Sequence, residues 1–218
     1  FRAVNVTIPY KALALALCDE VSEEAKAIGA VNTVVNRGGR LFGYNTDFGG
    51  FRLLVRHRGV SLAGKTVLIL GTGATQCTVR AVCTAEGAAQ VLCASRSAKP
   101  GALRYEQAAA RQDVNVIINA SPAGMYPNNG ICLVDLAAPG AFPALEAVFD
   151  VVYNPLRTRL LQMAEARGVP CAGGLLMLVA QAKYAAELFL GRPMEEQRIL
   201  EVYRSLLAEK AGLALVGM

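Results

Sequence analysis

A glycine-rich turn between an apolar strand and a helix is the feature that most constrains this fold. Thr66–Leu70 reads as a short buried strand, Gly71-Thr72-Gly73-Ala74 follows it directly, and a helix is predicted from there to about Glu86. Gly87 ends that helix, and Val91–Ala94 is the next apolar run. This order is typical of a parallel sheet in which backbone amides at a helix N-terminus can bind a pyrophosphate.

The alternation of strands and helices continues beyond this unit. Further strands are predicted at Val114–Asn119, Val148–Val152 and Val169–Cys171, and Leu160–Arg167 is the clearest connecting helix. Such alternation predicts an α/β protein with a Rossmann-like, doubly wound parallel sheet. We assign this domain to residues 61–173. Residues 174–218 are predicted to form C-terminal helices, in two segments broken near Gly191-Arg192-Pro193.

Residues 1–60 follow a different pattern, which predicts a smaller α/β lobe. Residues 2–8 alternate and predict a strand, and Pro9 begins a helix that runs to about Leu17, because proline suits a first helical turn. A second short helix is predicted over Ser22–Ile28, and a third over residues 48–57.

A strong hairpin signal lies within this lobe. The strand-like runs Val31–Asn36 and Leu41–Asn45 flank Arg37-Gly38-Gly39-Arg40, and a Gly-Gly loop suits a type I′ turn. Arg37 then faces Arg40, and paired residue numbers sum to 77. Polar residues gather at the open end of this hairpin, as a binding site requires: Asn32, Thr33, Asn45 and Asp47.

Composition excludes several classes of protein. The 218 residues are 54% hydrophobic and 18% charged, which excludes a disordered chain. No apolar run reaches the roughly 18 residues of a membrane span. The net charge of +5 comes from scattered residues, so neither a nucleic acid nor a membrane is expected as a partner. Because the chain starts at Phe1 rather than methionine, we expect it to be N-terminally incomplete.

The six cysteines do not form a metal-binding pattern. None forms a C-x-x-C pair, and most have apolar neighbours. The cysteines therefore indicate buried free thiols in a reducing cytoplasm and no metal site. We also expect a small molecule as the partner, and either a monomer or a homodimer.

The end of the second Rossmann-like strand predicts the cofactor. Ser95-Arg96-Ser97 contains no acid to bind the ribose hydroxyls of NAD, whereas Arg96 is suited to a 2′-phosphate. We therefore favour an Arg96 that binds NADP over the alternative, in which Arg96 is an ordinary surface arginine. Gly71, Gly73 and Ala74 would bind the pyrophosphate.

Lys11 and Asp47 are candidates for proton transfer. A lysine held beside a carboxylate can give or take a proton while a hydride moves. Each residue also has a simpler interpretation, because Lys11 can be an ordinary solvated lysine and Asp47 can cap the following helix.

A series of motifs identifies a resemblance to a known family. Asn5–Lys11 resembles the N-V-T-x-P-[FY]-K signature of shikimate dehydrogenases. Further family motifs follow in order: Gly29–Thr33 (G-A-V-N-T), Gly43–Asp47 (G-x-N-T-D), Asn119–Met125 (N-A-T-x-x-G-M), Asp150–Pro155 with Thr158 and Leu161 (D-x-x-Y-x-P-x-x-T-x-L), and Gly174–Leu178 with Gln181 and Ala182 (G-x-x-M-L-x-x-Q-A).

The resemblance implies an NADP-dependent oxidoreductase that reversibly reduces 3-dehydroshikimate to shikimate, in the biosynthesis of chorismate and aromatic amino acids. Lys11 would be the general acid and base, and Asp47 would fix it and bind a substrate hydroxyl. The resemblance also implies two further groups of site residues. Substrate contacts are Thr7, Asn32, Tyr153 and Gln181, and additional cofactor contacts are Asn119, Met125, Gly174 and Met177.

Alternatives stay open at this point. Met177 can be plain core and Tyr153 can simply pack its ring. The runner-up functions are a quinate/shikimate dehydrogenase of relaxed specificity and a non-catalytic, dehydrogenase-like ligand sensor. The family's Ser-x-Ser pair, which binds the substrate carboxylate, has no counterpart in residues 1–10, so a folded but inactive fragment is a third possibility.

Overall fold

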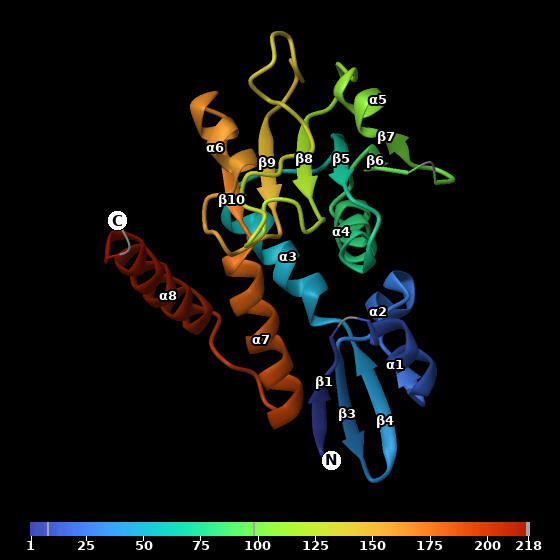
Figure 1. Cartoon of the computed structure of the whole chain (residues 1–218). Coiled ribbons are helices and arrows are strands. Elements are labelled where there is room, and N and C mark those ends of the chain that lie inside the picture. The colour runs from blue at the N-terminus through green and yellow to red at the C-terminus, as the bar shows by residue number, and fades with distance from the viewer. Residues whose placement is uncertain (8, 98, 217–218) are drawn as a thin grey trace. The chain divides into compact units, whose positions relative to one another are not determined.

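The computed structural model describes residues 1–7, 9–97 and 99–216 and divides into two compact units (Figure 1). The first unit contains Phe1–Leu53 and Leu175–Met218, and the second contains Leu54–Gly174. The α/β class with a parallel sheet is confirmed. The roles expected for residues 1–60, 61–173 and 174–218 stay predictions.

A four-stranded sheet forms the centre of the first unit. Its order is β1-β3-β4-β2, and only the β2–β4 pair is parallel. Buried Ala14, Ala25, Val31 and Val34 pack together as a small core. The elements are β1 (Ala3–Asn5), α1 (Lys11–Leu17), β2 (Glu20–Val21), α2 (Glu23–Ile28), β3 (Thr33–Arg37), β4 (Arg40–Tyr44), the first part of α3 (Thr46–His57), α7 (Leu175–Leu190) and α8 (Gln197–Val216).

The predicted hairpin is confirmed in both turn and register. Arg37 pairs with Arg40 and Thr33 pairs with Tyr44, so paired numbers sum to 77. Gly38 and Gly39 have φ angles of 61° and 93°, the left-handed conformation that a type I′ turn requires at both central residues. The hairpin thus brings Asn32 and Thr33 to the same end as the residues that begin α3.

A six-stranded, all-parallel sheet forms the centre of the second unit, in the order β10-β9-β8-β5-β6-β7. From β5 the next strands along the chain, β6 and β7, are added on one side, and β8, β9 and β10 are then added on the other. The switch point is therefore between β5 and β8, and in open α/β sheets ligands bind at such a point. Its elements are β5 (Thr66–Leu70), α4 (Ala74–Ala85), β6 (Gln90–Ser95), β7 (Leu103–Arg104), α5 (Tyr105–Ala109), β8 (Val116–Asn119), β9 (Ala147–Asp150), α6 (Arg159–Ala166) and β10 (Cys171–Gly173).

The core of this sheet explains its near-continuous apolar strands. Leu68 in β5, Ile117 in β8 and Val148 in β9 are fully buried and belong to one cluster with Leu160 of α6. Parallel strands covered on both faces bury both sets of side chains, so they do not alternate with polar residues.

Several elements differ from the sequence-based expectations. The predicted strand over residues 2–8 is wrong in length: β1 covers only Ala3–Asn5, a turn in which the Tyr10 amide donates to the Thr7 carbonyl follows, and Ile8 lies outside the described residues. The sequence patterns also miss β2, β7 and α5, which have two, two and five residues and are too short for a periodic signal. The predicted break between the C-terminal helices is confirmed, and residues 217–218 lie outside the description.

The expectation that the cysteines are buried is wrong for most of them. All six are free, but only Cys83 and Cys93 are buried, and Cys77 is exposed. The apolar neighbours of Cys93 correctly predict a buried strand, because Cys93 lies in β6. Cys77 lies in the first turn of α4, where its side chain is exposed. Burial raises the pKa of the Cys83 thiol to about 12, so this group is an inert part of the core.

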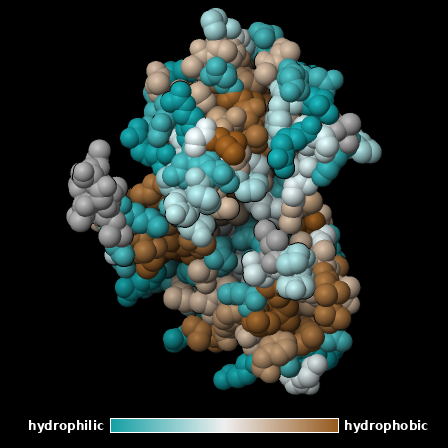
Figure 2. Space-filling model, viewed as in Figure 1, coloured by the Kyte–Doolittle hydropathy of each residue, from teal (hydrophilic) through white to brown (hydrophobic). Residues whose placement is uncertain are grey.

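Apolar side chains also remain on the surface of the first unit. Leu13 and Leu17 of α1 are 57% and 64% exposed, and Figure 2 shows apolar surface over this part of the chain. Within the described residues, no helix combines the length and the apolar character needed to span a membrane.

Candidate active site

Lys11 and Asp47 form a short ion pair in the first unit. The Lys11 Nζ lies 2.6 Å from Asp47 Oδ2, and the two side chains are 18% and 16% exposed. The contact joins residues 36 positions apart in the sequence. A short ion pair that still reaches solvent suits proton transfer, because the lysine is held in place and a ligand can approach it.

Local backbone structure places both members of the pair. Lys11 is the first residue of α1, directly after the turn between Thr7 and Tyr10. Asp47 is in the first turn of α3, where the helix dipole favours a carboxylate. Two features therefore stabilise the negative charge of Asp47: the N-terminus of α3 and the ammonium group of Lys11.

Asn32 is the centre of a buried network beside this pair. Its Oδ1 accepts hydrogen bonds from the Thr46 amide at 2.8 Å and from the Thr33 hydroxyl at 2.9 Å. Asn32 is 5% exposed and Thr33 is fully buried. The network joins the start of β3 to the start of α3, so it fixes the residue that precedes Asp47.

Helix α7 approaches α3 closely at Gly50. A Cβ atom on Gly50 would lie 2.7 Å from the Met177 carbonyl oxygen and 3.3 Å from the Gln181 Cβ, so only glycine fits there. Gln181 is half-buried, and its Nε2 donates to the Leu178 carbonyl. Gln181 of α7 therefore packs against α3 at Gly50, about one helical turn after Asp47.

The predicted substrate residues do not all lie in one unit. Thr7, Asn32, Asp47 and Gln181 belong to the first unit, whereas Tyr153 belongs to the second. Thr7 is exposed, and the Tyr153 side chain is 41% exposed. Their assignment to the substrate stays a prediction.

In the second unit, a cavity of about 270 Å³ lies above the glycine-rich turn. Gly71 has a φ of 108°, and a Cβ there would lie 3.0 Å from the Ser121 Cβ, so the turn requires glycine. No side chain caps α4 at Gly73, so backbone amides at the start of the helix, beginning at Ala74, can bind an anion, whereas the Gln76 amide already donates to the Gly73 carbonyl. The predicted residues Gly71, Gly73, Ser95, Arg96 and Ser97 all line this cavity.

The charge of the cavity suits a phosphate group. Arg96 and Lys99 line it, and none of its described lining residues is acidic. The Lys99 ammonium donates to the Thr72 hydroxyl at 2.9 Å, and the Ser95 hydroxyl donates to the Ser97 carbonyl. The Lys99–Thr72 contact holds the loop after β6 against the turn after β5, and the Ser95–Ser97 contact lies within that loop. Positive charge therefore lies beside the glycine-rich turn, as binding of phosphate groups requires.

A buried cluster around Asp150 was not predicted as a site feature. Asp150 ends β9 with no exposed surface, and it accepts hydrogen bonds from Asn119 at 2.9 Å, Thr158 at 2.7 Å and the Val152 amide at 3.0 Å. Burial raises the pKa of this carboxyl to about 6, although the three hydrogen bonds oppose the rise. Asn119 in turn holds Ser121 of the cofactor cavity through its Oδ1.

The remaining predicted cofactor residues are spread over both units. Met125 is 43% exposed in the second unit. A Cβ on Gly174 would lie 2.1 Å from the Val151 carbonyl oxygen, so this residue must be glycine for packing reasons alone. Met177 is 8% exposed and belongs to the first unit, in accord with its core interpretation.

Comparisons with known proteins agree with this architecture. Residues 1–34 match the family model described as the shikimate dehydrogenase substrate binding domain. A shikimate dehydrogenase (NADP(+)) from Symbiobacterium thermophilum is 38% identical over 211 residues, which cover 87% of this chain and 70% of that protein. One from Clostridium perfringens is 32% identical, with 94% and 78% covered.

Solved structures of the same kind superpose on this chain. A chorismate mutase/shikimate 5-dehydrogenase fusion protein from Clostridium acetobutylicum has a TM-score of 0.90 at 29% identity, with 96% of this chain and 78% of that chain covered. Shikimate 5-dehydrogenase from Thermus thermophilus, solved with NADP(H) and shikimate, has a TM-score of 0.81 at 34% identity, with 94% and 79% covered. Similarity of this extent in sequence and fold shows that the chain belongs to the shikimate dehydrogenase family.

Proposed function

We propose that this chain catalyses the reversible, NADP-dependent reduction of 3-dehydroshikimate to shikimate. The observation that carries the proposal is the 2.6 Å pair of Lys11 and Asp47, because binding alone does not require a lysine held for proton transfer. Membership of the shikimate dehydrogenase family supports the substrate and the cofactor.

Lys11 acts as the general acid during reduction. The substrate carbonyl carbon gains a hydride, and the Lys11 ammonium gives a proton to the carbonyl oxygen, so a ketone becomes a secondary alcohol. In the reverse direction the neutral amine takes that proton back. Asp47 keeps the lysine in place between turnovers and accepts a hydrogen bond from a neighbouring substrate hydroxyl.

The predicted substrate residues suit a substrate with several hydroxyl groups. Thr7, Asn32 and Gln181 of the first unit and Tyr153 of the second each offer a donor or an acceptor. A polyol needs such a ring of partners, because each buried polar group left unpaired costs about 1–3 kcal/mol.

The cavity in the second unit would hold NADP. The cofactor supplies the hydride when it is bound. Gly71 and Gly73 offer close backbone approach to its pyrophosphate, and the Ala74 amide at the start of α4 offers a donor. Arg96 with Lys99 offers two positive charges to its 2′-phosphate. Asn119 and Ser97 hold the surrounding loops. Met125, Gly174 and Met177 are the remaining residues predicted to contact the cofactor.

We also propose a cytoplasmic enzyme that acts on small molecules, with no nucleic-acid or membrane partner, as a monomer or a homodimer. The six free thiols support a reducing compartment. Gel filtration with light scattering would decide the oligomeric state.

The test measures NADPH formed from NADP and shikimate by the purified chain, with quinate and NAD as parallel arms. We expect shikimate-dependent NADPH formation, with shikimate and NADP preferred. Comparable rates on quinate would favour the relaxed quinate/shikimate dehydrogenase. Shikimate binding without any NADPH would contradict the enzyme and favour a sensor.

A pair of arginine variants tests the cofactor assignment separately. Arg96→Ala should weaken NADP about 10- to 100-fold and NAD little, because a charge-assisted contact to the 2′-phosphate is lost. Arg104→Ala is the matched control, since Arg104 is exposed in the same unit and does not line the cavity. Equal weakening of both cofactors by Arg96→Ala would show that Arg96 does not read the 2′-phosphate.

A further inference from the structure

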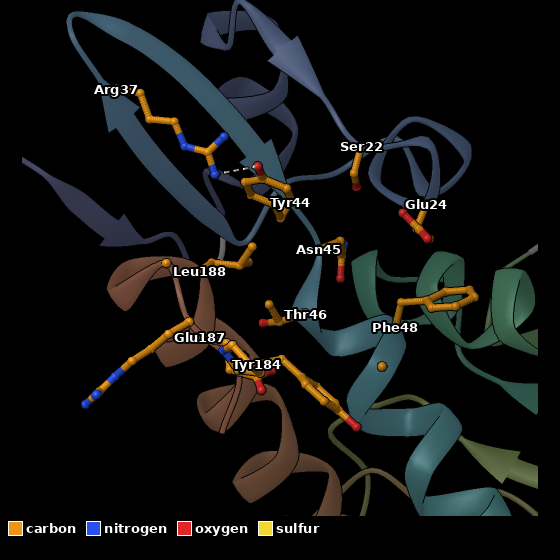
Figure 3. Close-up of a pocket in the computed structure, with 14 residues that line it drawn as sticks. Ser22, Glu24, Arg37, Tyr44, Asn45, Thr46, Phe48, Tyr184, Glu187 and Leu188 are labelled. Carbon is orange, nitrogen blue, oxygen red and sulfur yellow. Dashed lines mark hydrogen bonds between the residues drawn. The ribbon is translucent and has the colours of Figure 1, made fainter. Parts of the chain in front are cut away.

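A larger cavity lies in the first unit, apart from the Lys11–Asp47 pair. Its volume is about 690 Å³, within the range of small-molecule sites. It is bounded by the end of β4, the start of α2 and the C-terminal half of α7, and we call it the β4–α7 cavity (Figure 3). None of Lys11, Asp47, Asn32 and Gln181 lines it, so it is not the proposed active site.

One buried polar atom in the lining has no partner. Asn45 is 7% exposed, its Nδ2 donates to the Ala30 carbonyl at 2.9 Å, and its Oδ1 accepts no hydrogen bond from the described residues. A buried acceptor without a donor costs about 1–3 kcal/mol, and native proteins leave few of them. A ligand that carries an O–H group would satisfy it.

The walls of the cavity suit a flat ring. Tyr44, Phe48 and Tyr184 line it together with Leu188. A Cβ on Gly49 would lie 2.9 Å from the Tyr184 ring, so this glycine lets the ring lie directly against α3. Aromatic side chains pack most favourably against another aromatic ring, by stacking or edge to face.

The two ends of the cavity differ in charge. Glu24 lies at the end near Asn45, and within the described chain its carboxylate has no hydrogen-bond or ion-pair partner (Figure 3). Arg37 lies at the opposite end, beyond Tyr44, with its Nη2 3.4 Å from the Tyr44 hydroxyl. Arg192 also lines the cavity, whereas Glu187 is already paired with Lys183.

We propose that the β4–α7 cavity binds a small phenolic carboxylate. The phenol hydroxyl donates to Asn45 Oδ1, the ring packs between Phe48 and Tyr184, and the carboxylate pairs with Arg37. The orientation is fixed by charge, because Glu24 repels a carboxylate from the Asn45 end. The hydroxyl and the carboxylate must therefore lie at opposite ends of the ring.

Calorimetric titration with 4-hydroxyphenylacetate tests the proposal, with phenylacetate and 4-methylphenol as matched probes that lack the hydroxyl and the carboxylate. We expect 4-hydroxyphenylacetate to bind at one site per chain and each truncated probe to bind about tenfold more weakly. Absence of binding, or equal binding of phenylacetate, would overturn the proposal.

Three variants locate the binding. Arg37→Gln should weaken 4-hydroxyphenylacetate about tenfold, whereas Arg40→Gln, its hairpin partner outside the cavity, should leave the affinity unchanged. Lys11→Ala should also leave it unchanged. Binding that is lost in Lys11→Ala but kept in Arg37→Gln would place the ligand at the proposed active site and would reject the β4–α7 cavity.

Discussion

Two carboxylates, each just beyond or at the end of a strand, have opposite surroundings in this molecule. Asp47 is 16% exposed and lies 2.6 Å from the ammonium of Lys11. Asp150 is fully buried, and within the described residues its hydrogen-bond partners are all neutral donors, from Asn119, Thr158 and the Val152 amide. The first arrangement leaves a proton carrier within reach of a ligand. The second gives both oxygens of a buried carboxyl a hydrogen-bond donor and ties three segments together.

The difference shows how one residue type serves two purposes. A group that takes part in chemistry needs access and a partner whose proton can move. A group that holds loops needs every lone pair satisfied and no solvent. We therefore expect changes at the Lys11–Asp47 pair to alter turnover, and changes at Asp150 to alter stability.

Lys11→Ala should have the largest effect. We expect turnover to fall by about 10²- to 10⁴-fold, the usual contribution of a general acid, with little change in substrate affinity or melting temperature. Lys26→Ala is the matched control, because Lys26 forms only an exposed pair with Glu23. Steady-state rates of shikimate oxidation would measure both, and near-normal turnover of Lys11→Ala would remove this lysine from the chemistry.

Asp150→Ala should affect stability instead. The change removes the acceptor of the Thr158 hydroxyl, of the Val152 amide and of one N–H of the Asn119 side chain, so we expect a loss of roughly 3–4 kcal/mol in the free energy of unfolding. Asp113→Ala is the control, because Asp113 pairs with Arg111 on the surface, and we expect it to cost far less stability than Asp150→Ala. Urea titration would measure both, and similar losses would contradict the structural role of Asp150.

The pH dependence of stability sharpens the same contrast. Asp150 has a pKa of about 6 when folded and 3.8 as an ordinary carboxyl. Between these values the folded chain binds more protons than the unfolded chain, so the free energy of unfolding falls as pH rises from about 4 to about 6. The drop is on the order of 2–3 kcal/mol. Asp150→Asn should remove it from urea titrations across this range, and an unchanged slope would assign the drop to other groups.

The same contrast explains what the sequence could and could not predict. The strand before Gly71 and the Gly38-Gly39 hairpin follow from local periodicity and turn chemistry, which act over a few residues. The hairpin register in turn brings Asn32 and Thr33 to the residues that begin α3, as its spacing predicts.

Features that depend on distant partners could not be predicted in this way. The burial of Asp150 depends on strands β8 and β10 on either side of it and on Thr158 beyond it. The unpartnered Oδ1 of Asn45 and the exposure of Cys77 likewise depend on which neighbours tertiary packing provides. The sheet that makes Asp150 a buried residue is visible in the sequence only as separate apolar runs.

Asp47→Asn should have the smallest effect on stability, although Asp47 is in the proposed catalytic pair. The pair is partly buried, but solvent still reaches both side chains, and asparagine keeps an oxygen that can accept from the Lys11 ammonium. The loss therefore stays near the contribution of a surface pair or a first-turn carboxylate, each about 0–1 kcal/mol. We expect the free energy of unfolding to change by less than about 1 kcal/mol in urea titrations, while turnover falls markedly because Lys11 is no longer held. A loss of stability as large as that of Asp150→Ala would break the comparison, since it would make the Lys11–Asp47 contact a structural tie between α1 and α3.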